Sequence, residues 1–377
     1  MIPVTKAYIP DRTRYHNYVG EVLDSGWLTN GGRLLNTLEQ RLAEYLGVAH
    51  VICVANGSIA LQVAYKALGL SGEVITSPFS FVATSSTLVW EGLTPVYGDI
   101  CPHTFNLDPK TIVDKITPQT RAIVPVHVYG NPCDVDAIAE IANEHNLKVI
   151  YDAAHAFGTT LTDADNEARS VLTSGDISTV SFHATKLFHT IEGGAIITQD
   201  AAVAQRVRQM INFGITGLTS IDGLGTNAKM NEMEAAMGLC VLDEIQHIRH
   251  ERQCIWERYH NELQHVVTFQ TWHPESTNNH AYAPVLLASD EQVRQVQLAL
   301  QEQNVFTRRY FYPSLDTLSF GNSQPDTPIF NYANDIASRV LCLPIYPGLT
   351  TSEQSVIIEI MLQTLSSPIQ LTAEGTQ

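Results

Sequence analysis

The feature that most constrains this chain is an alternation of short β-branched runs with segments of helical length through its first two thirds. Such runs predict buried strands. Seven strands are expected, at His50–Val54, Val74–Thr76, Pro95–Asp99, Ala122–Val126, Val149–Asp152, Thr179–Phe182 and Ala195–Thr198. Because helical crossovers join parallel strands, the alternation predicts an α/β fold with a mostly parallel sheet flanked by helices.

Helices are predicted between the strands where apolar residues recur at three- and four-residue spacing. The segments Ile59–Leu68 and Ala137–His145 both show this spacing. Asn36, followed by Glu39 three residues later, is a candidate cap for an earlier helix that runs to Leu46.

The pattern changes from about Met230, where a long helical stretch begins. It leads into a region with fewer strand signals and more Pro and aromatic residues. We therefore expect a large α/β domain over residues 1–245 and a smaller α+β domain over residues 246–377. The last residues, roughly Ser366 to Gln377, are polar and small, and we expect them to be loosely ordered.

Composition limits the partners of the chain. Its 377 residues carry a formal net charge of −17, and no dense Lys/Arg run offsets it, so nucleic acid is not an expected partner. No segment approaches the roughly 18 uninterrupted apolar residues of a membrane-spanning helix. Residues 1–11 lack the basic head and apolar stretch of a signal peptide. We expect a cytoplasmic protein with no membrane partner.

The cysteines do not form a metal-binding pattern. They are scattered along the chain without paired spacing, which favours buried free thiols over zinc ligands or disulfides. They are Cys53, Cys101, Cys133, Cys240, Cys254 and Cys342. No metal is expected.

Two strand ends carry the residues with the strongest chemical signal. Asp152 closes a hydrophobic strand, at the carboxyl edge where parallel sheets bind ligands. A helix N-cap or a salt-bridge partner is the alternative interpretation of such an Asp. Lys186 lies just past the next strand among uncharged neighbours, where partial desolvation lowers an amine pKa and exposes a nucleophilic lone pair. A solvated surface cation is the alternative for a single Lys.

A third segment, Val54–Leu61, places small residues where a strand ends and a helix begins. Free backbone N–H groups at a helix start stabilise an anion such as phosphate. An Asn-Gly turn with Ser58 capping the helix is the alternative. The segment lacks the glycine spacing of a P-loop or of a dinucleotide-binding site. A binding site for pyridoxal 5′-phosphate requires three groups: a phosphate-binding segment, an amine and a carboxylate at a strand end.

These segments resemble the sugar aminotransferase family named for DegT, DnrJ and StrS, and the resemblance runs along nearly the whole chain. Lys186 in its His-Ala-Thr-Lys context is the most specific feature. Further similar segments are Ser25–Gly31, Pro78–Thr84, Val126–Gly130, Gly225–Glu232 and Arg308–Pro313. The resemblance implies the type I fold of the pyridoxal-phosphate-dependent aspartate aminotransferases, with a mostly parallel seven-stranded sheet and a smaller C-terminal α+β domain.

The resemblance also implies roles for individual residues. Lys186 would form a Schiff base with the cofactor, and Asp152 would pair with its protonated pyridine nitrogen; these two are the expected catalytic residues. The other expected cofactor contacts are Phe81 on the ring face, His155 near the ring hydroxyl, Gly57, Ser58 and Ser181 at the phosphate, and Asn227 from a neighbouring subunit. Active sites shared in this way require a homodimer.

Several residues near the expected site keep more than one interpretation. Phe81 could be a core aromatic residue instead. Lys229 stands where the family usually has Arg, and a Lys cannot reproduce the bidentate fork of Arg, so a substrate-carboxylate role there is in doubt. The aromatic cluster Tyr310–Tyr312 either shapes the cleft or packs between the domains. His127, His183 and His189 are also close to the site in sequence, and none receives a catalytic role.

The family implies an amino transfer from L-glutamate, which leaves as 2-oxoglutarate, to a nucleotide-linked 4-keto-6-deoxyhexose. The expected product is dTDP-4-amino-4,6-dideoxy-D-glucose, made for a surface polysaccharide such as O-antigen. A 3-keto sugar or a GDP-sugar is the alternative substrate. Family members that dehydrate sugars replace the lysine with His, whereas this chain retains Lys186. A non-catalytic regulatory or binding role is disfavoured by intact Lys186, Asp152 and Ser181.

Overall fold

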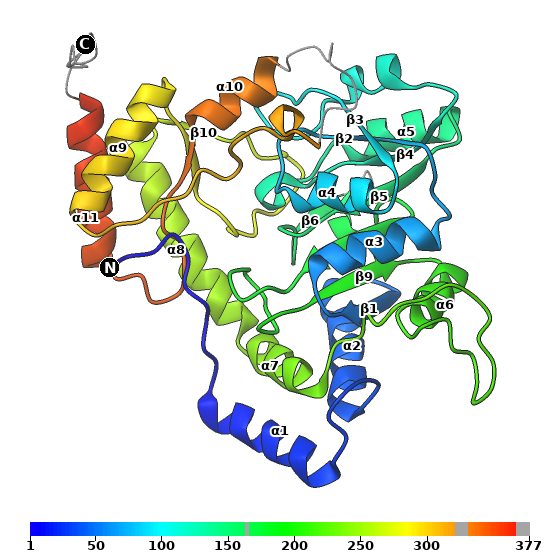
Figure 1. Ribbon diagram of the computed structural model, residues 1–377. Coiled ribbons are helices and arrows are strands. Elements are labelled where there is room, and N and C mark those ends of the chain that lie inside the picture. The colour runs from blue at the N-terminus through cyan, green and yellow to red at the C-terminus, as the bar shows by residue number, and fades with distance from the viewer. Residues whose placement is uncertain (163–165, 321–330, 367–377) are drawn as a thin grey trace.

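The computed structural model describes residues 1–162, 166–320 and 331–366. At its centre lies a seven-stranded sheet with the order β1-β9-β8-β5-β4-β2-β3 (Figure 1). Its strands are β1 (His50–Val54), β2 (Glu73–Thr76), β3 (Thr94–Tyr97), β4 (Thr120–Val124), β5 (Lys148–Asp152), β8 (Ile177–Ser181) and β9 (Gly194–Thr198). Only β9 runs antiparallel to its neighbours in this sheet, so the predicted mostly parallel sheet is confirmed.

The predicted strands all occur, with ends displaced by at most two residues. The run expected at Thr179–Phe182, for example, begins at Ile177 and ends at Ser181. These strands are buried on both faces, which makes their sequences continuous apolar runs. Val149 packs in one core and its neighbour Ile150 in the other, because successive side chains point to opposite faces.

Helices cover both faces of the sheet (Figure 1). One core contains residues of α2 (Arg33–Leu46), α5 (Val135–Glu144) and α7 (Glu232–Asp243). The opposite core contains residues of α3 (Gly57–Ala67), α4 (Ala83–Trp90) and α6 (Ala201–Met210). Helix α1 (Arg12–Ser25) contacts α7, and a small hairpin, β6 (Thr160–Thr162) and β7 (Ala168–Ser170), lies outside the main sheet.

The predicted cap of α2 was wrong. The helix begins at Arg33, so Asn36 lies inside it, and the N-cap residue Gly32 makes no side-chain cap bond. The carboxylate of Glu232 instead accepts hydrogen bonds from the N–H groups of Leu34 (2.9 Å) and Leu35 (3.0 Å). A residue about 200 positions away in the sequence therefore caps this helix, which no local pattern reveals.

The helical stretch expected from Met230 is two helices, because α7 ends at Asp243 and α8 (Ile245–Leu263) starts after one intervening residue. Helix α8 leads to an antiparallel three-stranded sheet with the order β10-β11-β12. The elements of this part are β10 (Thr268–Phe269), β11 (Pro284–Leu286), α9 (Asp290–Glu302), α10 (Asn331–Arg339), β12 (Val340–Cys342) and α11 (Thr351–Ser366). A smaller α+β unit follows the large sheet, as predicted.

The first residues of the chain lie on this C-terminal unit (Figure 1). Ile2 forms a parallel bridge with Val305, and its N–H donates to the carbonyl of Asn304 at 2.8 Å. The division at residues 245 and 246 stays a prediction. Residues 367–377, where we expected loose order, lie outside the described residues.

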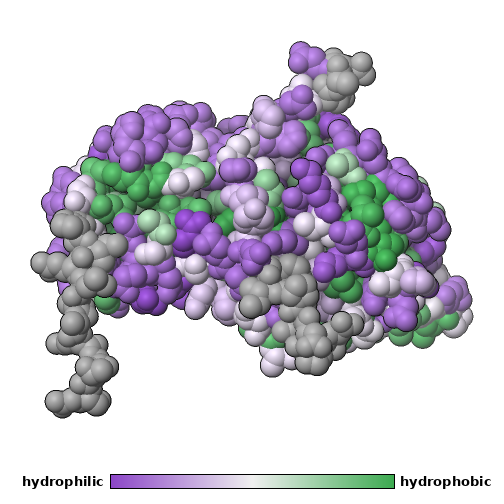
Figure 2. Space-filling model, turned by 90° about the horizontal axis from the view of Figure 1, so that it is seen from above, coloured by the Kyte–Doolittle hydropathy of each residue, from purple (hydrophilic) through white to green (hydrophobic). Residues whose placement is uncertain are grey.

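The surface seen from above is mostly hydrophilic, with separate hydrophobic areas (Figure 2). Among the described residues, no helix is long and apolar enough to cross a membrane. The expected burial of the thiols holds for Cys53, Cys133, Cys240 and Cys342. It fails for Cys101, which is half-buried, and for Cys254, which is exposed on α8.

Candidate active site

A cavity of about 340 Å³ lies at the carboxyl ends of β5 and β8. It brings together most of the predicted site residues, namely Gly57, Ser58, Phe81, Asp152, His155, Ser181 and Lys186. Asn227 does not line the cavity: it is exposed and forms a bridge with Asn212. Within one subunit, the expected contact between Asn227 and the site is therefore not made.

Lys186 lies on the loop that joins β8 to β9. Its Nζ donates a hydrogen bond to the hydroxyl of Tyr282 at 3.1 Å. Burial lowers the pKa of Lys186 to about 8, although the negative charge of Asp152 acts in the opposite direction. A larger fraction of this amine is therefore neutral near pH 7 than of an exposed lysine, and only the neutral amine is a nucleophile.

Asp152 ends β5 and does not cap a helix. Its side chain is buried, with 6 % of the residue exposed. Oδ2 accepts a hydrogen bond from Thr84 Oγ1 at 2.7 Å, and Oδ1 accepts one from the Ala154 N–H at 3.2 Å. Burial raises the pKa of Asp152, while these two hydrogen bonds and the charge of Lys186 oppose the rise. The carboxylate is thus fixed in orientation at the floor of the cavity.

The start of α3 forms the third part of the site. Asn56, not Ser58, caps this helix, because its side chain accepts from the Ile59 N–H at 2.9 Å. Gly57 and Ser58 occupy the first turn, where N–H groups have no acceptor within the helix. A Cβ on Gly57 would lie 3.0 Å from the Cβ of Ser181, so glycine allows the close approach of α3 to the end of β8. These N–H groups and the helix dipole can hold an anion.

Aromatic rings form the remaining walls. Phe81 is 54 % exposed and lines the cavity, so it is not a core residue. The His155 ring stacks on Phe311, with the centroids 5.4 Å apart, and its Nδ1 accepts from the Tyr129 N–H at 3.3 Å. Burial lowers the pKa of His155, which favours a neutral ring whose proton lies on Nε2.

Sequence reasoning missed two residues of this site. Thr84, which holds Asp152, lies within a segment that we singled out, but its role depends on the fold. Tyr282 comes from the C-terminal unit, just before β11. Its segment is tied to the site by Asn279, whose Nδ2 donates to the carbonyls of His155 (2.7 Å) and Phe157 (3.1 Å). No strand end of the main sheet lies near Tyr282 in sequence, so no local signal could have found it.

The residues left open by the sequence take different positions. His183 lines the cavity, with its Nδ1 2.7 Å from Thr185 Oγ1. His127 stacks on Tyr151 in the core, and His189 Nε2 lies 2.7 Å from the carbonyl of Tyr8, so both are structural. Lys229 donates to Asn212 Oδ1 at 3.1 Å and is not part of the cavity lining.

This arrangement fits pyridoxal phosphate. The cavity offers a partly neutral amine, a fixed carboxylate, an exposed aromatic face and a helix start that can bind phosphate. These are four different chemical needs of one cofactor, and they come from four separate stretches of chain. Gly57, Ser58 and Ser181 would hold the cofactor's phosphate, Phe81 would cover its ring, and Asp152 would pair with the ring nitrogen.

Comparisons with known proteins show the family of this chain. A model of the DegT/DnrJ/EryC1/StrS aminotransferase family matches residues 11–362. The chain is 41 % identical over 367 residues to a dTDP-4-amino-4,6-dideoxy-D-glucose transaminase from Shigella dysenteriae, which covers 96 % of this chain and 97 % of the relative.

Solved structures share the fold. DesI, crystallised in the presence of its TDP-sugar product, superposes on this chain with a TM-score of 0.90 at 36 % identity. The match covers 97 % of this chain and 93 % of the DesI chain. NtdA from Bacillus subtilis, with bound cofactor PMP, gives a TM-score of 0.85 at 29 % identity over 94 % of this chain and 82 % of its own. On this evidence, the chain belongs to the DegT/DnrJ/EryC1/StrS aminotransferase family, whose members are pyridoxal-phosphate-dependent sugar aminotransferases.

Proposed function

We propose that this enzyme transfers the amino group of L-glutamate to a dTDP-linked 4-keto-6-deoxyglucose, giving dTDP-4-amino-4,6-dideoxy-D-glucose and 2-oxoglutarate. One observation carries the transferase chemistry: the Lys186 amine and the Asp152 carboxylate lie in one cavity beside the start of α3. The choice of sugar is supported by the relative from Shigella dysenteriae, which matches over almost the whole chain. The cytoplasmic location stays a prediction from the sequence.

Lys186 performs the covalent and proton-transfer chemistry in this proposal. Bound pyridoxal phosphate supplies an aldehyde that takes up amino groups and a ring that accepts the electron pair left when a proton leaves carbon. Lys186 would hold the cofactor through its amine. Burial lowers the pKa of this amine, and a neutral amine can take a proton from the α-carbon of the amino donor.

Asp152 keeps the ring nitrogen protonated. A buried carboxylate beside a cationic nitrogen is stabilised in its charged form. The hydrogen bond from Thr84 and the N–H of Ala154 hold both oxygens in place, so the carboxylate needs no rearrangement during the reaction. The Thr84 Oγ1 atom also lies 2.7 Å from the Ser80 hydroxyl oxygen, so a second hydrogen bond orients the residue that holds Asp152.

The remaining residues bind and orient. Gly57, Ser58 and Ser181 hold the phosphate, because their groups converge where α3 meets the end of β8. Phe81 covers one face of the ring, and the Nε2–H of His155 is available to the ring hydroxyl. The loop between β8 and β9 carries Lys186 and also His183 and Glu192, which line the cavity mouth.

We also propose a homodimer with shared active sites. The loop at 213–225 projects beside α6 (Figure 1). Several of its large apolar side chains are exposed to solvent. They include Phe213, Ile215, Leu218, Ile221 and Leu224. Clustered exposed apolar side chains of this kind mark protein–protein interfaces. A second copy covering this loop would also enclose the neighbouring Asn227, which one subunit leaves exposed.

The proposal is tested by measuring 2-oxoglutarate formation from L-glutamate with a panel of keto sugars. The panel contains dTDP- and GDP-linked 4-keto-6-deoxyhexoses and a dTDP-linked 3-keto sugar. We expect kcat/KM to be at least ~10-fold higher for the dTDP-linked 4-keto-6-deoxyglucose than for the others, since contacts to distinct groups discriminate by at least that factor. A preference for the GDP-linked or the 3-keto sugar would replace the substrate assignment, and no turnover with any sugar would remove it.

A further inference from the structure

Helix α8 carries one buried arginine, Arg252, of which 3 % is exposed. Its Nη1 donates a hydrogen bond to the carbonyl of Ala281 at 3.1 Å. Among the described residues no carboxylate forms an ion pair with it, and its Nε has no hydrogen-bond partner. Burial lowers the pKa of Arg252 to about 10, so the guanidinium stays charged near pH 7. The interior therefore holds a cation without a counter-ion.

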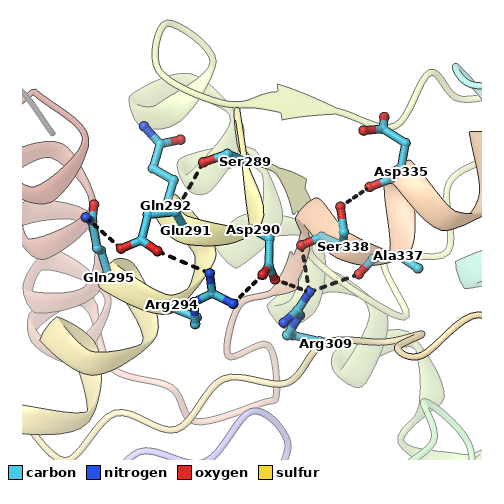
Figure 3. A network of polar contacts seen from close by, with 10 residues as sticks. All are labelled: Ser289, Asp290, Glu291, Gln292, Arg294, Gln295, Arg309, Asp335, Ala337 and Ser338. Carbon is cyan, nitrogen blue, oxygen red and sulfur yellow. Dashed lines mark hydrogen bonds and ion pairs between the residues drawn. The ribbon is translucent and has the colours of Figure 1, made fainter. Parts of the chain in front are cut away.

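Another arginine of low exposure shows the difference. Arg309, with 14 % of its side chain exposed, lies at the centre of the polar network in Figure 3. Its Nη2 donates to the carbonyl of Ser338 at 2.6 Å and lies 2.8 Å from Asp290 Oδ1, so a carboxylate balances its charge. A buried charge without such a partner costs free energy of folding. The stability of the fold therefore does not explain why position 252 carries a charge.

Arg252 holds a segment without regular secondary structure, residues 277–283. Within this segment, the Tyr282 hydroxyl accepts a hydrogen bond from Lys186 Nζ at 3.1 Å. The carbonyl that Arg252 binds belongs to Ala281, the residue immediately before Tyr282. Asn279 ties the same segment to the loop that follows β5. Tyr282 is thus held from two directions, by α8 and by the large sheet.

We propose that Arg252 is a positioning residue of the active site, which fixes the backbone at Ala281 so that the Tyr282 hydroxyl stays bonded to Lys186 Nζ; this inference rests on the role of Lys186 in the proposed function. Arg252 does not line the active-site cavity, whereas Tyr282 does. It therefore acts through Tyr282. A hydrogen bond accepted from an ammonium group stabilises the charged form, so Arg252 raises the proton affinity of the Lys186 amine from outside the cavity.

A direct effect of the Arg252 charge on the amine would have the opposite sign. If Arg252 acted through its charge alone, its removal would raise the pKa of Lys186, because like charges repel. If it acts through Tyr282, its removal weakens the hydrogen bond to the ammonium form and lowers that pKa. The direction of the change in a variant without Arg252 thus separates the two mechanisms.

Other titratable groups surround both residues. Those that share the cavity with the Lys186 amine, besides Tyr282, are Asp152, His155, His183, Glu192 and Tyr310. Those that interact electrostatically with Arg252 are Tyr282, His189 and His280. Only Arg252, Tyr282 and one distant arginine are replaced in the experiment, so the other groups are the same in every comparison.

The experiment measures the pH midpoint for modification of Lys186 by an amine reagent in the full-length, cofactor-free chain, located by peptide mass spectrometry. We expect Arg252→Met to lower this midpoint by at least ~0.5 pH units, as a weakened hydrogen bond to the ammonium form predicts. The double variant Arg252→Met/Tyr282→Phe should have the midpoint of Tyr282→Phe alone. Arg252→Lys keeps a cationic donor and should recover part of the change.

A matched control lies on the same helix. Arg258 also donates to a backbone carbonyl, that of Thr351 at 2.8 Å, but on the side of α11. Arg258→Met should leave the midpoint of Lys186 unchanged. Thermal unfolding identifies a variant that does not fold. If Arg252→Met is one, Arg252→Gln replaces it, since its amide ends two bonds short of the Nη1 of Arg and should lower the midpoint in the same way.

Two results would overturn the positioning role. One is a midpoint that rises or stays unchanged without Arg252. The other is a double variant whose change is the sum of the two single changes, because Arg252 would then not act through Tyr282. The spectral response of the wild-type holoenzyme to L-glutamate reads the proposed function separately. If that response is present while the midpoint ignores Arg252, the positioning role alone fails; if it is absent, the proposed function fails whatever the midpoints show.

Discussion

At the scale of single residues, burial lowers the pKa of the Lys186 amine, and the same amine forms a hydrogen bond with Tyr282. The Tyr282 hydroxyl oxygen accepts this hydrogen bond from Lys186 Nζ, which stabilises the ammonium form. Replacing Tyr282 with Phe should therefore lower the pKa of Lys186 further below its value of about 8, by roughly one unit. The measurement is the pH midpoint for modification of Lys186 by an amine reagent in cofactor-free protein, located by peptide mass spectrometry.

A matched control exists in the same part of the chain. Tyr259 is also buried, but its hydroxyl donates to the Pro344 carbonyl at 3.0 Å and not to the active site. Tyr259→Phe should leave the midpoint of Lys186 unchanged. A midpoint in Tyr282→Phe that rises, or that matches this control, would show that Tyr282 does not stabilise the ammonium.

Burial of Lys186 also predicts a pH-dependent stability. Its pKa is about 8 in the folded protein and 10.5 as a free side chain, so the unfolded chain binds more protons between these values. The stability of the wild type therefore rises with pH in that window. We expect cofactor-free Lys186→Met to be more stable than wild type at pH 7, with the difference shrinking towards pH 10. Urea unfolding at both pH values measures the difference in the free energy of unfolding. A difference that does not change with pH would contradict the effect of burial on the Lys186 pKa.

At the scale of elements, the cap of α2 shows why some helix boundaries could not be predicted from the sequence. Glu232 is 2 % exposed and accepts from two N–H groups at the start of α2. Glu232→Ala should destabilise the protein by about 2–4 kcal/mol, because it leaves these buried N–H groups without an acceptor. Chemical denaturation measures this change.

The control for the cap is Glu44→Ala, which removes an exposed carboxylate from the same helix. Its effect should stay within about 0.5 kcal/mol. If Glu232→Ala were no more destabilising than Glu44→Ala, the N–H groups would have another acceptor and the proposed cap would be wrong.

The strands, by contrast, were predictable from local sequence. Each is a short β-branched run buried on both faces, so burial and propensity favour the same structure. The residue at which a helix starts depends on which hydrogen-bond acceptor reaches the free N–H groups of its first turn. Asn56 supplies it locally for α3, whereas Glu232 supplies it across the fold for α2. Local sequence can reveal only the first kind.

At the scale of the whole molecule, the active site joins parts that are distant in sequence. Asp152 and Lys186 were predictable because Asp152 ends one strand of the main sheet and Lys186 follows another. Tyr282 and Thr84 were not, because their roles arise only when the C-terminal unit and α4 pack onto that edge.

The proposed dimer gives a prediction at this scale. Leu218 is fully exposed on the 213–225 loop, and Trp90, 83 % exposed, lines a surface cavity with Leu224 of that loop. Leu218→Asp should shift the protein towards monomer and lower turnover in parallel, because a charge does not fit an apolar interface. Sedimentation velocity measures the shift. Leu298→Asp, on the exposed side of α9, is the control and should leave the assembly unchanged.

The most direct test of the central claim is the absorbance of the purified protein from about 300 to 500 nm, before and after L-glutamate. We expect a yellow protein whose visible band is lost with glutamate, and a Lys186→Ala variant whose spectrum does not change in this way. Lys148→Ala, which removes an exposed lysine paired with Asp176, should behave as wild type. A colourless wild type that pyridoxal phosphate cannot reconstitute, or a full glutamate response without Lys186, would contradict the assignment.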